Sequence, residues 1–294
     1  MKKIQQFEYK LSPLHAALEG IKAEFSNDDL ISTDPILFPK RYQNPLDIEI
    51  VALLSALYAY GNVIAIQRFL EPIFQALGEN PYYAFATRSE RFEQAIKVVQ
   101  KYRFQTKEDN ENILYALSEI LRVHRETDDN NAIFEEFFLF KGSNFEPVSS
   151  IARFQKKLLS QLESKKPITG GIRFWIGDPE SHSAKKRICL FLRWMVRRNH
   201  PDFGIYKRIS QAEIPFPLDT HIQRLVQILG LSTRKTYGMR EAILVRDQFL
   251  RLSPEDPLQY DFYLTRVGII QRCKAKRIES ICGGCGLRSV CNIW

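Results

Sequence analysis

Residues 44–57 read Asn-Pro-Leu-Asp-Ile-Glu-Ile-Val-Ala-Leu-Leu-Ser-Ala-Leu, and this stretch decides the fold class. Its apolar residues recur at the 3.6-residue spacing of an α-helix. Asn44 is a favoured helix cap, and Pro45 suits the first helical position because proline lacks an N–H that the first turn would leave unpaired. The stretch therefore predicts a helix that begins at this Asn-Pro pair.

The same helical pattern continues along the rest of the chain. Further amphipathic helices are expected at 64–77, 92–101, 111–122, 132–140, 151–163, 184–198, 220–230, 238–252 and 257–271. Loops rich in proline and glycine interrupt them, notably at 167–171 and 199–217. Because the alternating pattern of strands is scarce, the sequence predicts an all-α fold.

The composition is that of a globular protein, with 45% hydrophobic residues in a chain of 294. The longest uncharged run, 50–67, is interrupted by Ser55, Gly61 and Asn62, which favours a buried helix over a membrane span. The first six residues, Met-Lys-Lys-Ile-Gln-Gln, contain no apolar signal core. We therefore expect a cytoplasmic protein with no membrane partner.

Positive charge is concentrated in the second half of the chain. Residues 1–150 carry 16 Lys and Arg against 22 Asp and Glu, whereas residues 151–294 carry 26 against 12. Such an uneven excess is expected where one face of a protein neutralises phosphates and releases counterions. From charge alone, a basic surface that is merely solvated is an equally good interpretation.

Four of the five cysteines lie near the end of the chain, at Cys273, Cys282, Cys285 and Cys291. In a cytosolic protein such thiols stay reduced, so a metal centre explains them better than disulfides do. Zinc and a [4Fe–4S] cluster both accept four thiolates. Zinc ribbons usually have two separate C-x2-C pairs, whereas this tail has one pair flanked by single cysteines. The spacing favours the iron–sulfur cluster, with zinc as the alternative, and it leaves Cys189 as a core residue.

Three segments resemble the helix–hairpin–helix DNA glycosylases and occur in that family's order. The cysteine tail resembles the iron–sulfur loop of endonuclease III and of the adenine-mismatch glycosylases, although eight residues rather than six follow the first cysteine. Residues 217–231, which include Pro-Leu-Asp-Thr-His and end in Leu-Gly-Leu, resemble the segment that carries the family's catalytic aspartate. Residues 44–56 resemble its N-P-F…L-L-S-A helix. We expect the nearest relatives in an uncharacterised bacterial branch of this superfamily.

The resemblance implies a two-lobed helical fold with a C-terminal cluster loop. We expect a terminal lobe made of residues 1–43 and 232–294, and a helical domain over 44–231. That domain would hold an insertion around 80–165 and a degenerate helix–hairpin–helix near 174–198. The implied function is removal of a damaged or mismatched base from double-stranded DNA by a monomer, with AP-lyase activity in some members. The alternative is a DNA-binding or damage-sensing protein of the same fold without catalysis.

Asp219 is the candidate catalytic carboxylate. Cleavage of an N-glycosidic bond develops positive charge on the sugar, which a fixed carboxylate stabilises. Asp219 also suits the N-cap of the helix expected at 220–230, and the two roles are compatible because backbone dipoles at a helix start favour a carboxylate. We expect His221 to support this turn by hydrogen bonding.

The lysine that forms a Schiff base in the bifunctional members corresponds to Lys185 or Lys186. The family's glycine-rich turn is absent from the segment before them. Lys186 fits better, because the family's buried positions would then fall on Ile188, Leu190 and Phe191. For Lys185 they would include Arg187. The alternative is that both lysines only contact phosphate.

Further residues are candidates for contact with DNA. In the cluster loop these are the basic side chains Lys274, Lys276, Arg277 and Arg288, and beside the lysine pair Arg187. Along the helix expected at 184–198, Arg193, Arg197 and Arg198 either line a DNA groove or form a solvated face. Tyr58 and Tyr60 stand near the family's gap-filling glutamine, and either stack on bases or pack in the core.

Overall fold

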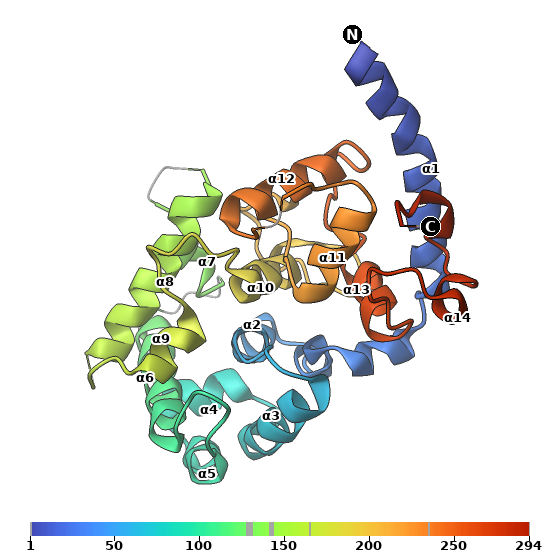
Figure 1. Cartoon of the computed structure of the whole chain (residues 1–294). Coiled ribbons are helices and arrows are strands. Elements are labelled where there is room, and N and C mark those ends of the chain that lie inside the picture. Colours follow the sequence, from blue (N-terminus) through green and yellow to red (C-terminus); the bar gives the residue numbers. More distant parts are fainter. Residues whose placement is uncertain (1, 128–131, 141–143, 165, 235, 294) are drawn as a thin grey trace.

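A computed structural model describes residues 2–127, 132–140, 144–164, 166–234 and 236–293, with the backbone alone for residues 2–12. These residues form helices joined by loops (Figure 1). Within them there is no β-strand, only two isolated bridges, Tyr102–Gln105 and Ser183–Gly238. The predicted all-α class is confirmed. No helix in the described ranges is both long enough and apolar enough to span a bilayer.

The α-helices are α1 (Lys2–Glu24), α2 (Pro45–Leu57), α3 (Val63–Leu77), α4 (Pro81–Thr87), α5 (Glu90–Val98), α6 (Lys107–Glu126), α7 (Glu135–Phe138), α8 (Pro147–Glu163), α9 (Gly170–Ile176), α10 (Lys186–Val196), α11 (Thr220–Ile228), α12 (Met239–Leu250), α13 (Asp261–Ile269) and α14 (Glu279–Cys282). The 3-10 helices are η1 (Asp28–Thr33), η2 (Pro35–Leu37), η3 (Pro39–Arg41), η4 (Gln211–Glu213) and η5 (Arg288–Val290).

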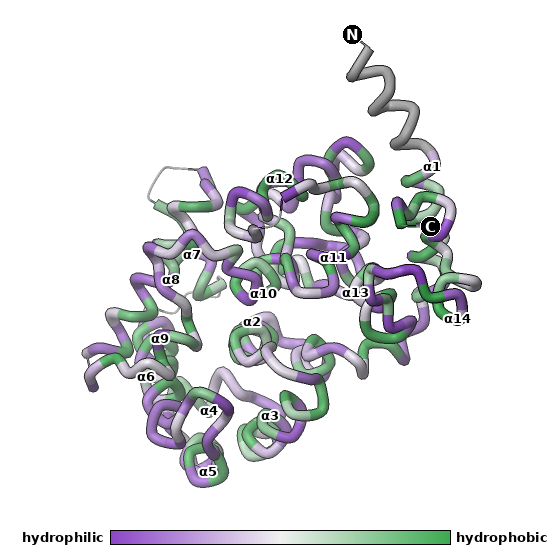
Figure 2. Tube along the Cα trace, viewed as in Figure 1, coloured by the Kyte–Doolittle hydropathy of each residue, from purple (hydrophilic) through white to green (hydrophobic). Residues whose placement is uncertain are grey.

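Helix α2 begins as the sequence predicts. The Asn44 side chain accepts a hydrogen bond from the N–H of Leu46 at 2.9 Å, and Pro45 is the first helical residue. From Asp47 to Leu57 every residue is buried, because α2 packs against α4 on one side and α10 on the other. Figure 2 shows the matching hydrophobic character of α2, whereas outer helices such as α8 alternate between hydrophobic and hydrophilic residues.

The helices are arranged in two groups around α2 (Figure 1). Helices α3 to α9 form one group, and α10 to α14 with α1 form the other. The end of α1 packs beside the C-terminal tail, where Leu18 and Ile21 are buried and Lys22 Nζ donates to Gln259 Oε1 at 2.7 Å. Helix α11 packs on α13, so an element of the predicted 44–231 domain lies with the terminal segments. The position of the domain boundary stays a prediction.

Candidate functional site

A cavity of about 590 Å³ lies where the two groups of helices meet. Its lining comes from residues far apart in the chain: 33–35, the α2–α3 connection, α9 and α10, residues 217–223 and α13. Asp219, Lys186, Arg193 and Asp261 are all among the lining residues. The chain thus gathers charged side chains from three helix starts around a space large enough for a small organic group.

Asp219 caps the N-terminus of α11. Its Oδ1 accepts the N–H groups of His221 at 2.8 Å and of Ile222 at 2.7 Å, which fixes the carboxylate at the cavity wall. Within the described chain no donor reaches Oδ2. His221 thus supports the turn through its backbone N–H and not through its ring. The ring packs against Gly268, where an added Cβ would lie 2.5 Å from it. Asp219 can cap the helix and face the cavity at the same time, because Oδ1 accepts both capping hydrogen bonds and leaves Oδ2 available.

A second carboxylate, Asp261, lies beside Asp219 at the start of α13. Burial raises its pKa to about 6; the Arg193 guanidinium, which donates to Asp261 Oδ2, opposes this shift, and the charge of Asp219 adds to it. Nothing in the sequence marks Asp261, since an acidic residue in the first turn of an apolar helix is ordinary. The cavity is therefore lined by two neighbouring carboxylates, one of which is paired with the buried Arg193.

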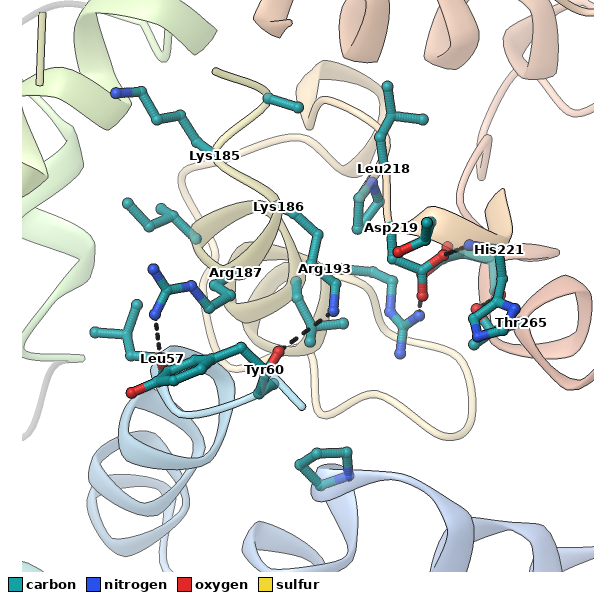
Figure 3. Close-up of a pocket in the computed structure, with 18 of the residues that line it drawn as sticks. Leu57, Tyr60, Lys185, Lys186, Arg187, Arg193, Leu218, Asp219, His221 and Thr265 are labelled. Carbon is teal, nitrogen blue, oxygen red and sulfur yellow. Dashed lines mark hydrogen bonds and ion pairs between the residues drawn. The ribbon is translucent and has the colours of Figure 1, made fainter. Parts of the chain in front are cut away.

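The two candidate lysines point in different directions (Figure 3). Lys186 is the first residue of α10, and its Nζ lies 3.5 Å from the Ala59 carbonyl across the cavity. Lys185 turns away from Asp219, and its Nζ donates to the Asp178 carbonyl and to Ser181 Oγ, the latter at 2.9 Å. Burial lowers the pKa of Lys185, but its orientation keeps that amine from the Asp219 side. The geometry favours Lys186.

Arg187 belongs to a different wall of the cavity. In Figure 3, Arg187 and Tyr60 lie on one side of Lys186, and Asp219 lies on the other. The Arg187 guanidinium donates to the Leu57 carbonyl at 2.6 Å and lies 4.8 Å from the Tyr60 ring centre and 5.0 Å from that of Phe174. Burial lowers its pKa to about 10. Arg187 thus packs as part of this wall while staying partly exposed, and its contact with a DNA phosphate stays a prediction.

Tyr58 is a core residue, which corrects its assignment as a DNA contact. Its side chain is 1% exposed and its hydroxyl donates to Asn110 Oδ1 at 2.7 Å, so it has no path to a base. Leu57 is fully buried beside it. Tyr60, two residues later, lines the cavity.

Two arginines, one on α10 and one just after its end, are buried as well, contrary to the expectation of a groove-lining or solvated helix face. Arg193 and Arg197 are each 2% exposed. Arg193 pairs with Asp202 at 3.2 Å and with Asp261, and Arg197 pairs with Asp202 at 2.8 Å and with Asp256 at 2.9 Å. These ion pairs fix α10 to the loop after it and to α13. They account for part of the positive charge in the second half of the chain.

The four cysteines of the tail line one small apolar cavity of about 30 Å³. Its other walls come from α11, α13 and the last residues of the tail, including Leu225, Ile228, Val267 and Leu287. Each of the four is a free thiol. Burial raises the pKa of Cys285, and the other three thiols add to this shift because they lie nearby. In the described chain, no three His, Cys, Asp or Glu side chains gather as ligands of a single ion.

The basic side chains of this tail are on the surface. Lys274, Lys276, Arg277 and Arg288 are all exposed, and they lie between the four cysteines in the sequence. Arg277 lies 3.9 Å from Glu279, a loose surface pair. Their contact with DNA stays a prediction.

The sequence matches a family profile described as "Protein of unknown function (DUF2400)" over residues 34–270, about four fifths of the chain. The chain belongs to the DUF2400 family. The matched region contains both Asp219 and Lys186 and ends just before the first cysteine of the tail. Neither the curated proteins nor the solved structures gave a match to this DUF2400 chain.

Two further buried polar groups line the cavity of the DUF2400 chain and have no motif that would reveal them. Gln155, on α8, is fully buried; its amide nitrogen donates to the Ile176 carbonyl at 2.8 Å, while its Oε1 has no partner in the described chain. The indole N–H of Trp175, which is 1% exposed, also has none there. An acceptor and a donor left unpaired at one cavity are suited to a polar ligand.

Proposed function

We propose that this protein is a DNA glycosylase that removes a damaged or mismatched base by cleaving its N-glycosidic bond. It would act as a monomer on double-stranded DNA in the cytoplasm. The observation that carries the proposal is that Asp219 and Lys186, separated by 32 residues, line the same cavity from two helix starts. That cavity would receive the nucleotide after its extrusion from the duplex.

In this proposal Asp219 stabilises the sugar as its bond to the base breaks. The two backbone N–H groups that hold Oδ1 position the carboxylate before substrate binds, so no reorganisation is needed during the reaction. Oδ2 would face the positive charge that develops on the deoxyribose. A water molecule deprotonated by this carboxylate would then attack C1′ and give the abasic product.

Lys186 would supply the nucleophile if the enzyme also cuts the strand. Its Nζ would leave the Ala59 carbonyl and bond to C1′ as the bond to the base breaks and the base leaves with a proton. Opening of the sugar ring then gives the Schiff base that strand cleavage requires. The position of Lys186 opposite Asp219 supports this order of events.

We also propose that the four tail cysteines hold a [4Fe–4S] cluster, with zinc as the alternative. Their arrangement around a cavity rather than around one point suits a centre in which each thiolate binds a different iron. When bound, the cluster would hold the tail rigid, so that Lys274, Lys276, Arg277 and Arg288 meet phosphates in fixed positions. An absorption spectrum and metal analysis of anaerobically purified protein distinguish iron from zinc.

The second candidate is a protein that binds damaged DNA without catalysis. One observation favours it: nine residues, 177–185, separate α9 from α10, where the resembled enzymes have a short glycine-rich turn. A longer connection that ties Lys185 to Asp178 and Ser181 provides no equivalent set of backbone amides for a phosphate.

A panel of duplexes, each with one lesion or mismatch, tests both candidates. We expect the wild-type protein to release the base from at least one duplex, and Asp219→Asn to release it about 100-fold more slowly or not at all. Asparagine is an equally good N-cap, so this variant should fold and bind DNA as the wild type does. Tight binding by the wild type with no base release from any duplex would favour the second candidate.

A further inference from the structure

A tight turn beside the cavity presents two exposed side chains, Arg103 and Phe104. Tyr102 and Gln105 close the turn with reciprocal backbone hydrogen bonds of 3.0 and 2.9 Å. Arg103 has a left-handed backbone with φ of 50°. Phe104 is 56% exposed, which is a high value for a phenylalanine in a globular protein. The segment 80–165, to which the sequence assigns no role, contains this turn.

The turn is fixed to the cavity wall by side chains at both of its ends. The Tyr102 hydroxyl donates to the Tyr60 carbonyl at 2.7 Å, and the Tyr60 hydroxyl donates to Gln105 Oε1. The amide of Gln105 donates to the Gly171 carbonyl at the start of α9, also at 2.7 Å. Its tip is therefore held in place although it projects into solvent.

Exposed aromatic rings gather at this tip. The ring centre of Phe104 lies 4.3 Å from that of Phe174, which is 40% exposed, and both rings approach Tyr60. Tyr60 and Gly61 line the cavity, and a Cβ on Gly61 would lie 3.0 Å from the Arg103 guanidinium. The aromatic group is thus continuous with the cavity on the side opposite Asp219.

The charges around these rings fit nucleic acid. Arg103 and Lys101 on the turn and Arg173 next to Phe174 are all exposed. An exposed aromatic surface bordered by cations matches bases bordered by phosphates, because rings stack on bases while arginine and lysine contact the backbone. Apolar side chains that enter between base steps are a common device of proteins that deform DNA.

We propose that the Arg103–Phe104 turn contacts the duplex at the gap left by the extruded nucleotide. Phe104, backed by Phe174, stacks on a base beside the gap, and Arg103 contacts a neighbouring phosphate. The inference rests on the proposed function, because the gap arises only if a nucleotide enters the cavity. Leu57 and Tyr58 cannot fill this gap, since both are buried in the core.

The test uses a duplex with one tetrahydrofuran residue, a stable abasic analogue, and 2-aminopurine as the base directly beside it. Stacking on 2-aminopurine changes its fluorescence. We expect a clear change with the wild-type chain, loss of most of that change with Phe104→Ala, and recovery with Phe104→Trp. Phe104→Ala should also weaken binding roughly 10-fold, the usual effect of removing one stacking side chain.

Arg103→Gly tests the phosphate contact, and glycine tolerates the left-handed backbone at this position. This variant should retain the fluorescence change and reduce the salt dependence of binding by about one phosphate contact.

Phe140→Ala provides the matched control. Phe140 is 47% exposed and lies under the Arg153 guanidinium at 4.5 Å, but on a separate surface that includes no residue of the cavity. It should behave as the wild type. Equal fluorescence and affinity for Phe104→Ala and the wild type, or no binding of this duplex by the wild type, overturns the inference. Failure of the proposed function has a different signature: base release is then absent from the lesion panel while the Phe104-dependent fluorescence change persists.

Discussion

The cavity has two walls of opposite character. The polar wall carries Lys186 and Asp219, each at or next to the first residue of a helix and each within a short recognisable segment. The aromatic wall carries Tyr60, which lines the cavity and is extended outward by Phe104 and Phe174. These residues come from three separate segments and meet only through tertiary hydrogen bonds and ring contacts. Local sequence can therefore reveal chemical groups, whereas a recognition surface built from distant segments becomes visible only in the fold.

The largest expected effect is on covalent trapping of DNA, through the lysine of the polar wall. Lys186→Ala should reduce borohydride-trapped protein–DNA adduct at least 100-fold if the protein is a lyase, because its amine would be the nucleophile in the cavity that Asp219 lines. Lys185→Ala, a matched control one residue earlier, should stay within about threefold of the wild type, since its amine is directed to Asp178 and Ser181. Trapping that persists in Lys186→Ala and disappears in Lys185→Ala would reverse the assignment.

The next effect concerns Glu49 on α2, the helix that leads to Tyr60 and the aromatic wall. Glu49 is fully buried, where it accepts hydrogen bonds from the backbone of Ile133 and Phe134 and from the Tyr206 hydroxyl. Burial raises its pKa to about 7, although these hydrogen bonds oppose the shift. The folded state therefore holds the proton more tightly than the unfolded state does.

From this shift, the free energy of unfolding should fall as pH rises from about 4.5 to about 7. The decrease from this one group is on the order of 3 kcal/mol. Glu49→Gln cannot titrate, so its stability should rise relative to the wild type over the same interval. Urea unfolding of both proteins at several pH values measures the difference, and parallel curves would exclude a raised pKa for Glu49.

A smaller effect on the free energy of unfolding is expected for Tyr58, which lies in the core beside the aromatic wall. Tyr58→Phe should lower the free energy of unfolding by about 1–2 kcal/mol, because it leaves Asn110 Oδ1 without its buried donor. The affinity of the folded protein for DNA should not change, since Tyr58 is in the core. An unchanged stability together with weaker DNA binding would instead place Tyr58 at the DNA surface.

Much of the fold could be predicted from the sequence, because the signals were local. The helices expected at 64–77 and 151–163 are observed as α3 and α8, with ends shifted by a few residues. Short helices were missed: α4 and α9 each have seven residues, too few for a clear apolar period, and the helix expected at 132–140 shrinks to the four residues of α7.

The site could be predicted only where a residue's role follows from its neighbours in sequence. The N-cap of Asp219 follows from the apolar pattern that comes after it. The burial of Arg193, Arg197 and Tyr58 does not, because their partners Asp202, Asp256, Asp261 and Asn110 approach through tertiary packing. The same reason explains why Asp261 and Phe104 gave no signal.

The most direct test of the central claim measures affinity for two abasic analogues in otherwise identical duplexes. One holds a neutral tetrahydrofuran and the other a pyrrolidine, whose protonated ring nitrogen imitates the positive charge of the transition state. If the Asp219 carboxylate lies beside the sugar, the wild-type protein binds the pyrrolidine duplex at least about 10-fold more tightly, and Asp219→Asn loses this preference. Equal affinity of the wild-type protein for the two duplexes would contradict the assignment of Asp219 and, with it, the proposed function.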